Sequence, residues 1–302
     1  MLNVLVTGGA GYIGYSLVEK LEASDDVDRI YVLDNLVKGN HNFFLGGNKL
    51  RKTQFIKGEI LDHHGLSKVL DKVQIVYHLA AHVSFPYSHE ENLRYEQINQ
   101  WGTSILSQEI AKYENIEKVI YLSSAAVYGQ VESADIDTLP QPNNDYGRSK
   151  LEGEKMIRLL GPSKKVTIVR SANVFGYNPC IRLDAVLNQF IFKALTFGKV
   201  HIYGDGTQYR PFVSLDVLCD LLMDELRLDS QQETKNVVEF NASMNEIVKE
   251  ILNLIPEMEY IYVNQNQKFQ GLRITPTHPA SLANSIAVAI EAFKKNLRFA
   301  KA

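Results

Sequence analysis

Residues 7–14 read TGGAGYIG and connect the first apolar run of the chain, residues 2–6, to its first helix-period segment, residues 12–21. The run predicts a buried strand and the segment predicts an amphipathic helix. Glycines in such a turn let the backbone approach a pyrophosphate, which then lies at the positive end of the helix. The spacing Gly-x-x-Gly-x-x-Gly also fits a simple strand-to-helix turn, so the residues that follow must distinguish a dinucleotide site from such a turn.

An acid stands where a dinucleotide site needs one. Asp34 closes the second predicted strand, twenty residues after Gly14. A carboxylate there accepts hydrogen bonds from the adenosine ribose hydroxyls and repels a 2′-phosphate. The combination predicts a dinucleotide site that prefers NAD to NADP, although Lys38 lies close enough to keep NADP open.

Short apolar runs alternate with longer amphipathic segments through the first 172 residues. They predict buried strands at 2–6, 29–33, 53–56, 75–79, 119–122 and 166–169, and helices at 12–21, 93–113 and 149–160. Strand and helix in alternation imply right-handed βαβ units. The predicted fold class is α/β, with residues 1–172 forming a Rossmann-type, doubly wound parallel sheet that binds NAD.

The alternation fades after residue 172. Helical segments at 183–197, 215–226 and 244–254 mix with a short strand at 201–203. Residues 173–302 therefore predict a smaller C-terminal substrate-binding lobe, placed over the carboxyl ends of the strands. A segment near 201–220 is predicted to return to the NAD-binding domain. The polar stretch 229–235 is predicted to be an exposed loop.

Composition narrows the class of protein. Hydrophobic residues make up 45% and charged residues 22% of 302, the usual balance of a globular protein. A net charge of −3 gives no reason to expect nucleic acid or an anionic membrane as a partner. No apolar run approaches the roughly 18 residues that span a bilayer, and the start of the chain lacks a signal-peptide pattern. The only cysteines, Cys180 and Cys219, form no disulfide framework, so a cytoplasmic location is predicted.

A phenol and an ammonium group stand one helical turn apart in the stretch YGRSK, as Tyr146 and Lys150. A nearby cation stabilises a phenolate and lowers the tyrosine pKa towards neutrality. Such a phenol can exchange a proton with a carbinol while hydride moves to or from nicotinamide. One Tyr-x-x-x-Lys pair is expected by chance in a chain of this composition, so the motif needs support.

That support comes from Ser124, which ends the fifth predicted strand and so lies on the same side of the sheet as the glycine turn. Its hydroxyl can bind the substrate oxygen and orient the proton. His78 and His82 have the spacing of metal ligands, but they lie at a strand end, and a structural role is predicted rather than a metal site.

Taken together, the sequence resembles the extended short-chain dehydrogenase/reductase family, and within it the NAD-dependent epimerase/dehydratase group, whose nucleotide-sugar 4-epimerases it looks most like. The resemblance covers roughly residues 1–220. It is carried by TGGAGYIG at 7–14, LDNL at 33–36, GEILD at 58–62, HLAA at 78–81, NQWGT at 99–103, SSAAVYG at 123–129, YGRSK at 146–150, RSANVFG at 170–176 and GDGTQYRPFVSLD at 204–216.

The resemblance implies roles for particular positions. The cofactor site would include Gly8, Gly11, Tyr12, Ile13, Gly14, Asp34, Asn35, Tyr146 and Lys150, with Glu59 and Ile60 near adenine, Leu79, Ala80 and Ala81 on the nicotinamide side, and Asn99 beneath it. The catalytic residues would be Ser124, Tyr146 and Lys150, with Ser124 also binding the substrate. Asn173, Asn188 and Arg210 would hold the nucleotide diphosphate, and a guanidinium such as that of Arg210 can grip phosphate bidentately.

One departure from the family pattern selects among its reactions. The family's dehydratases usually carry an Asp-Glu pair directly after the catalytic hydroxyl, whereas this chain has Ala125 and Ala126. The expected function is therefore an NAD-dependent epimerase that inverts C4 of a nucleoside-diphosphate hexose through a 4-keto intermediate. A nucleotide-sugar 4-dehydrogenase or 4-keto reductase would use the same site, and a non-catalytic NAD-binding sensor is a third interpretation.

The family also suggests a quaternary structure and a setting. Helices around residues 93–113 and 146–160 correspond to those that pair across a dimer interface in relatives, so a homodimer is expected by analogy. Polysaccharide biosynthesis is a pathway that such enzymes often serve, but no residue of this chain shows it.

Overall fold

The fold of the chain is that of a computed structural model that describes residues 1–45, 50–83, 92–229, 231–264, 266, 269 and 271–297. The predicted lobe at 173–302 thus ends in five residues that lie outside the described part. The main body is a seven-stranded sheet in the order β10-β6-β5-β4-β1-β2-β3, and every neighbouring pair is parallel. Its strands are β1 (Leu2–Thr7), β2 (Val27–Asp34), β3 (Thr53–Lys57), β4 (Ile75–His78), β5 (Lys118–Ser124), β6 (Lys165–Ser171) and β10 (Gln232–Val237).

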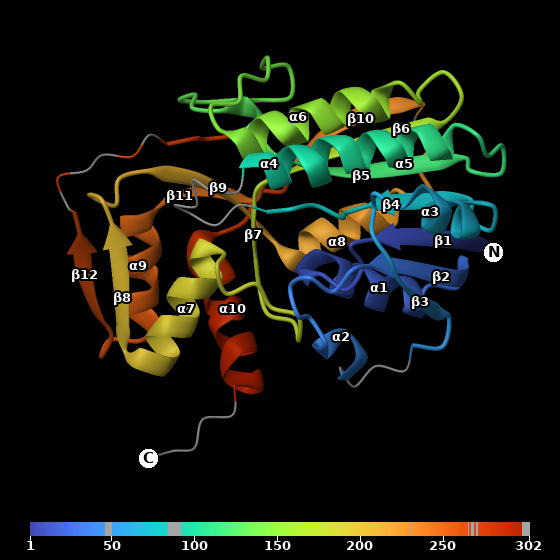
Figure 1. The fold of residues 1–302 in the computed structure, drawn as a ribbon. Helices are drawn as coiled ribbons and strands as arrows, with labels where there is room; N and C mark the ends of the chain where they lie inside the picture. The colour runs from blue at the N-terminus through green and yellow to red at the C-terminus, as the bar shows by residue number, and fades with distance from the viewer. Residues whose placement is uncertain are drawn as a thin grey trace.

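Helices cover both faces of this sheet, so its strands read as nearly unbroken apolar runs. On one face α1 (Tyr12–Ala23) packs against α8 (Leu215–Asp224), and on the other α5 (Thr103–Ile110) lies between α3 (His63–Leu70) and α6 (Asp145–Arg158) (Figure 1). Each face has its own core, with Leu17 and Leu218 in one and Leu66 and Leu106 in the other. The prediction of a doubly wound Rossmann-type sheet is confirmed.

The order of the strands places the ligand site. From β1 the chain first moves to β2 and β3 on one side, and then crosses to β4, β5 and β6 on the other. The direction reverses between β1 and β4, and ligands of open α/β sheets bind outside the carboxyl ends of the strands at such a switch point. The glycine turn follows β1 and the HLAA stretch ends β4, so both lie at this point.

A second group of elements follows β6. A three-stranded sheet has the order β11-β9-β7, and β12 pairs with β8 in a two-stranded parallel sheet. The elements are β7 (Asn173–Phe175), α7 (Val186–Phe197), β8 (Lys199–Tyr203), β9 (Tyr209–Ser214), β11 (Phe240–Ser243), α9 (Met244–Leu254), β12 (Glu259–Val263) and α10 (Leu282–Asn296). The apolar faces of α7, α9 and α10 meet in a separate core around Ile191, Ile247 and Phe293 (Figure 1). The boundary at 172 stays a prediction; the chain returns to the large sheet through α8 and β10.

The prediction of an exposed loop at 229–235 is wrong for residues 232–235. They belong to β10, which adds the seventh strand by pairing with β6 from Gln232↔Val166 to Val237↔Ser171. The polar composition hid the strand, because β10 lies at the edge of the sheet and its outward side chains need no apolar contact. The predicted helix at 93–113 also differs, since it consists of α4 (Asn92–Arg94), a π-helix, η1 (Tyr95–Gly102), and α5.

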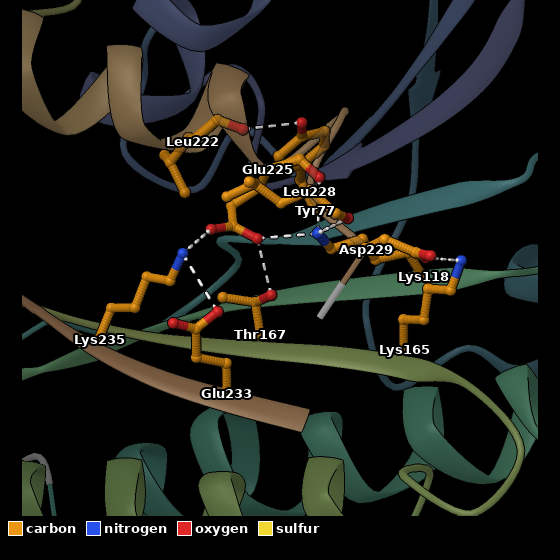
Figure 2. Close-up of polar contacts among 10 residues, drawn as sticks. All are labelled: Tyr77, Lys118, Lys165, Thr167, Leu222, Glu225, Leu228, Asp229, Glu233 and Lys235. Carbon is orange, nitrogen blue, oxygen red and sulfur yellow. Dashed lines mark hydrogen bonds and ion pairs between the residues drawn. The ribbon is translucent and has the colours of Figure 1, made fainter. Parts of the chain in front are cut away.

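One charged residue of β10, Lys235, reaches into a buried cluster. Glu225, just after α8, is fully buried and accepts hydrogen bonds from Lys118 Nζ, Lys235 Nζ and Thr167 Oγ1, each at 2.8 Å (Figure 2). Burial would raise the pKa of Glu225, but the hydrogen bonds from the two lysines and Thr167 outweigh it and lower the pKa. The cluster therefore holds an ionised carboxylate that ties the end of α8 to β5, β6 and β10.

No helix in the described part of the chain is long and apolar enough to cross a membrane.

Candidate active site

The glycine turn forms an open cradle at the start of α1. Gly8 has a φ of +72°, and a Cβ on it would lie 2.7 Å from Ala80 N. A Cβ on Gly14 would lie 2.3 Å from Gly8 O, so neither position accepts a side chain. Gly11 is the N-cap of α1, and no side chain caps the helix there. The first turn, which includes Tyr12 and Ile13, contains no acidic residue. The first amide groups of the helix thus suit a pyrophosphate, as a dinucleotide requires.

Asp34 lies beside this cradle, as predicted from its position at the end of β2. Its Oδ2 accepts a hydrogen bond from Ala10 N at 3.1 Å and its Oδ1 accepts one from Leu36 N at 2.8 Å. Burial raises the pKa of Asp34, while these backbone hydrogen bonds oppose the rise. Next to it, Asn35 Nδ2 donates to Glu59 Oε2 at 3.0 Å, so the two residues predicted near ribose and adenine are in contact.

Replacing Asp34 by asparagine is expected to weaken NAD binding about 10- to 100-fold and to reduce the preference for NAD over NADP. The change removes the charge that accepts from ribose hydroxyls and repels a 2′-phosphate, and a hydrogen bond to a charged group contributes about 1.5–3 kcal/mol. Asparagine keeps the Oδ1 acceptor for Leu36 N but loses the Oδ2 acceptor for Ala10 N, so thermal unfolding without cofactor serves as the control for the turn. Calorimetric titration with both cofactors gives the two affinities, and an unchanged ratio would remove Asp34 from the ribose site.

The residues predicted on the nicotinamide side follow β4 and adjoin the turn. Leu79 N donates to Thr7 O at 3.1 Å, and Ala80 N donates to Thr7 Oγ1 at 3.3 Å, so this segment runs beside the end of β1. Ala81 comes next. Ile60, which was predicted near adenine, packs against η1, since a Cβ on Gly102 would lie 2.6 Å from Ile60 Cγ2.

Asn99 ties three parts of the site together. It is fully buried in η1, its Oδ1 accepts from His82 N at 2.7 Å, and its Nδ2 donates to His82 O at 2.9 Å and to Ser149 Oγ at 3.0 Å. Ser149 belongs to α6, so one amide side chain links the segment after β4 to the helix that carries Tyr146 and Lys150. π-Helical turns are rare and are frequent at functional sites, because the wider turn redirects a side chain.

His78 is held on both sides by hydroxyl groups. Its Nδ1 lies 2.8 Å from Thr7 Oγ1 and its Nε2 lies 2.9 Å from Thr103 Oγ1. Burial and then the charge of Lys150 lower the pKa of His78 to about 3, so the ring is neutral. Within the described ranges no three side chains of the metal-binding types come together.

The structure brings Ser124 and Tyr146 together. Ser124 ends β5 and caps the 3₁₀ turn η2 (Ala125–Tyr128), where its Oγ accepts from Ala126 N at 3.2 Å. Tyr146 lies in the first turn of α6, which is capped by Asn144, and is hydrogen-bonded to the Ser124 side chain. Lys150 follows one turn later, with its Nζ 4.2 Å from the centre of the Tyr121 ring.

The predicted lowering of the Tyr146 pKa is not found. Burial raises the pKa of Tyr146, and the charge of Arg182 and the hydrogen bond with Ser124 only oppose that rise. Burial also lowers the pKa of Lys150 to about 7, because its side chain is 2% exposed. The spacing along the helix predicted that the two groups are one turn apart, but it did not reveal that both are buried. Burial disfavours the charged form of each group.

The three residues predicted to hold the diphosphate differ in burial and in the hydrogen bonds that they make. Asn188 is fully buried and engaged, since its Oδ1 accepts from Gly176 N at 2.9 Å and its Nδ2 donates to the Tyr12 hydroxyl at 3.2 Å. It braces α7 against α1, and Tyr12 donates in turn to Gly176 O at 2.7 Å. Asn173 is exposed and donates to Pro211 O at 2.9 Å, and Arg210 Nη1 donates to Tyr209 O at 3.2 Å.

A cleft of about 410 Å³ beside Arg210 contains residues that the sequence did not single out. It is lined by Gln130, Val131, Glu132, Thr207, Gln208, Tyr209, Phe269, Gly271 and Arg273. The Arg273 guanidinium lies 3.5 Å from the centre of the Tyr209 ring, so two arginines contact Tyr209. The buried Oε1 of Gln208 has no hydrogen-bond partner among the described residues.

Tyr95 and Arg182 are further neighbours of Tyr146 that were missed. The rings of Tyr95 and Tyr146 meet edge to face at 6.0 Å, and the buried Tyr95 hydroxyl has no partner in the part of the chain that the structure describes. Arg182, close enough for its charge to act on Tyr146, forms an ion pair with Asp184 at 3.0 Å. Both residues lie far from YGRSK in sequence, and no local pattern marks them.

A tyrosine-lysine helix beside the glycine turn of a doubly wound sheet defines a class, the Rossmann-fold enzymes that use a nicotinamide dinucleotide. Within that class, residues 4–237 match the NAD dependent epimerase/dehydratase family. The chain belongs to this family, and NAD is its cofactor.

Relatives within the family carry out more than one reaction. The chain is 31% identical over 241 residues to UDP-glucose 4-epimerase of Lacticaseibacillus casei, covering 72% of this chain and 70% of that protein. It is 28% identical over 325 residues to dTDP-D-glucose 4,6-dehydratase of Homo sapiens, covering 97% and 90%. The crystal structure of UDP-glucose 4-epimerase from Thermotoga maritima with UDP-glucose is similar at 26% identity and a TM-score of 0.85, covering 98% of this chain and all of the other.

Proposed function

We propose that the protein is a nucleotide-sugar 4-epimerase that inverts C4 of a nucleoside-diphosphate hexose. The observation that carries the proposal is the Ser124–Tyr146 pair, followed by Ala125 and Ala126 in the turn η2. Elimination of water needs an acid and a base beside the sugar, and two methyl groups supply neither. The remaining chemistry at this pair is transfer of a proton at a carbinol oxygen, which serves oxidation and reduction at C4.

Each side chain has one task in this reaction. Tyr146, as phenolate, accepts the proton of the C4 hydroxyl, and the Ser124 hydroxyl binds the same oxygen. A charged Lys150, one turn further along α6, would favour this phenolate against the burial that raises the Tyr146 pKa. NAD, when bound, supplies the acceptor for the C4 hydride and returns that hydride afterwards. Once the 4-keto sugar presents its other face, Tyr146 returns the proton to O4, so the overall reaction consumes no proton and no electron pair.

The arginines at Tyr209 support a diphosphate-linked substrate. Arg210 donates to the backbone oxygen of Tyr209, and the Arg273 guanidinium lies over the Tyr209 ring. Tyr209 and Arg273 both line the cleft. Two guanidinium groups suit the two negative phosphates of a nucleoside diphosphate. The relative from Thermotoga maritima was solved with UDP-glucose, and we therefore favour UDP-linked hexoses.

The homodimer stays a prediction. Trp101 of η1 and Leu159 after α6 are 66% and 72% exposed, and they are apolar side chains that a contact through these helices would cover.

The proposed function is tested by incubating the purified protein with UDP-glucose, UDP-GlcNAc and GDP-mannose that carry deuterium at C4. We expect NMR to detect a C4-inverted sugar that retains the deuterium, with no net gain in NADH absorbance, because the same hydride returns. Stoichiometric NADH with a 4-keto product would instead establish a 4-dehydrogenase. A 4-keto-6-deoxy product would show dehydration and overturn the argument from Ala125 and Ala126.

A further inference from the structure

A buried ion pair lies behind the catalytic lysine. Glu154 follows Lys150 by one turn of α6 and is 1% exposed. Its Oε1 accepts hydrogen bonds from Ser123 Oγ at 2.6 Å and from Arg170 Nε at 2.9 Å, and its Oε2 accepts one from Arg170 Nη2 at 2.8 Å. Arg170, in β6, is 4% exposed. The proton-transfer steps proposed above do not use this pair.

The pair is joined to both arms of the proposed site. Ser123 immediately precedes Ser124 at the end of β5. Arg170 Nη1 donates to the Tyr128 hydroxyl at 3.0 Å, and Tyr128 ends the turn that Ser124 begins. Close packing fixes α6 on β5 at Gly153, where a Cβ would lie 2.3 Å from the Tyr121 hydroxyl. Glu154 therefore links the segment that carries Ser124 to the helix that carries Lys150.

Among the described residues, the groups around Lys150 are mostly uncharged. The Tyr121 ring of β5 faces its Nζ and attracts a cation through its π electrons. From β4 it is faced by His78, which is neutral, and Tyr146, whose ring contacts Tyr95 of η1, precedes it by one turn of α6. Burial lowers the pKa of Lys150, and the charge of Glu154 opposes that shift. Arg170 lies beyond Glu154 and offsets part of its field.

We propose that Glu154 is a positioning residue for the proton-transfer site: its carboxylate keeps Lys150 charged beside Tyr146, and Arg170 sets the strength of that effect. This inference rests on the proposed role of Lys150 in catalysis. Buried ion pairs are often retained without adding stability, and a role in tuning a neighbouring charge gives this one a reason to be kept.

The two halves of the pair predict opposite effects on the pH profile. A lysine is charged below its pKa, so activity that needs charged Lys150 is lost as pH rises through that pKa. E154Q removes the negative charge and leaves Arg170, so the alkaline limb of kcat should move down by about one to two pH units. R170M removes the nearer and more buried of two cations on Glu154, while the half-exposed Arg158 stays 3.7 Å from its Oε2, so the limb should still move up.

A purely structural pair predicts something different, because either substitution breaks the same contact. Both variants would then lose thermal stability and kcat in parallel, with the limb unmoved or moved in one direction, and that outcome overturns the proposal. Glu225→Gln is the control, since Glu225 is another buried glutamate, held by two lysines and a hydroxyl, but lies in the cluster of Figure 2. It should lower the melting temperature and leave the pH profile unchanged.

A second readout does not depend on turnover. In protein labelled with ¹³C at lysine Cε, the Lys150 resonance, assigned with K150M, titrates with the charge of that group. Its midpoint should fall in E154Q and rise in R170M, and equal midpoints would sink the proposal even if no sugar substrate had been found. If E154Q does not fold, the double variant E154Q/R170M removes both charges together, and its midpoint should lie below that of R170M.

Discussion

Replacing Tyr146 by phenylalanine is expected to lower kcat about 100- to 10,000-fold, the range in which a general acid-base group contributes to catalysis. The phenyl ring fills the same space beside Tyr95 but carries no oxygen to exchange a proton with the sugar hydroxyl. Ser124 would remain as a hydrogen-bonding group without a base behind it. Because the ring is kept, KM and NAD affinity should change little. Steady-state kinetics on the epimerase substrate, with NAD binding by calorimetry, give both quantities.

A second buried tyrosine provides the comparison. Tyr77 in β4 donates to Leu222 O at 2.9 Å and lies in the ion cluster of α8, away from the proposed site (Figure 2). Tyr77→Phe loses one hydrogen bond, so it should cost about 1 kcal/mol of stability and leave kcat as it was. A Tyr146→Phe enzyme that retained more than a tenth of its kcat would assign the proton transfer to another group, and Ser124 would be the next to replace.

The predictable parts of the fold are those in which buried positions are occupied by apolar residues. Strands β1, β4 and β5 are covered by helices on both faces, so Val4–Val6, Val76 and Ile120 had to be apolar, and their runs could be read. β10 could not be found in this way, because Lys235 satisfies a buried carboxylate contributed from ten residues earlier in the chain. A pattern of hydrophobicity does not reveal a strand that is held by ions.

The site divides along a similar line. Gly8, Asp34, Ser124 and Tyr146 were predictable because each stands at a strand end or helix start, and parallel strands bring those ends to one edge. Tyr95 reaches Tyr146, and Arg273 reaches Tyr209, through tertiary contacts that no spacing encodes. The protonation states were the least predictable, since they depend on burial and on contacts from distant parts of the chain. Tyr121 faces Lys150, Tyr95 packs on Tyr146, and the charge of Arg182 acts on Tyr146.

The second large effect is expected from Gly8→Ala, which should lower NAD affinity by at least about 100-fold or prevent folding. Two separate strains act at this position. The backbone has a φ of +72°, a region that costs an L-residue roughly 1–2 kcal/mol. In addition, the new methyl group would lie 2.7 Å from Ala80 N and 2.8 Å from Ala80 Cα. Those atoms are backbone beside β4, so the methyl group can be accommodated only by moving the turn or the nicotinamide side of the site.

Two further alanine variants separate these strains. Gly198 has a φ of +59°, and a Cβ on it would meet nothing within 4 Å, so Gly198→Ala introduces the backbone strain alone and should lower the melting temperature by a few degrees with NAD binding intact. Gly11 has an ordinary φ, but its Cβ would lie 3.1 Å from Gly8 O, so Gly11→Ala should fold and bind NAD more weakly. Thermal unfolding with and without NAD measures both effects for all three variants. If Gly8→Ala and Gly198→Ala changed the melting temperature and the NAD affinity equally, backbone strain alone would explain both variants. Contact between the turn and Ala80 would then have no role in NAD binding.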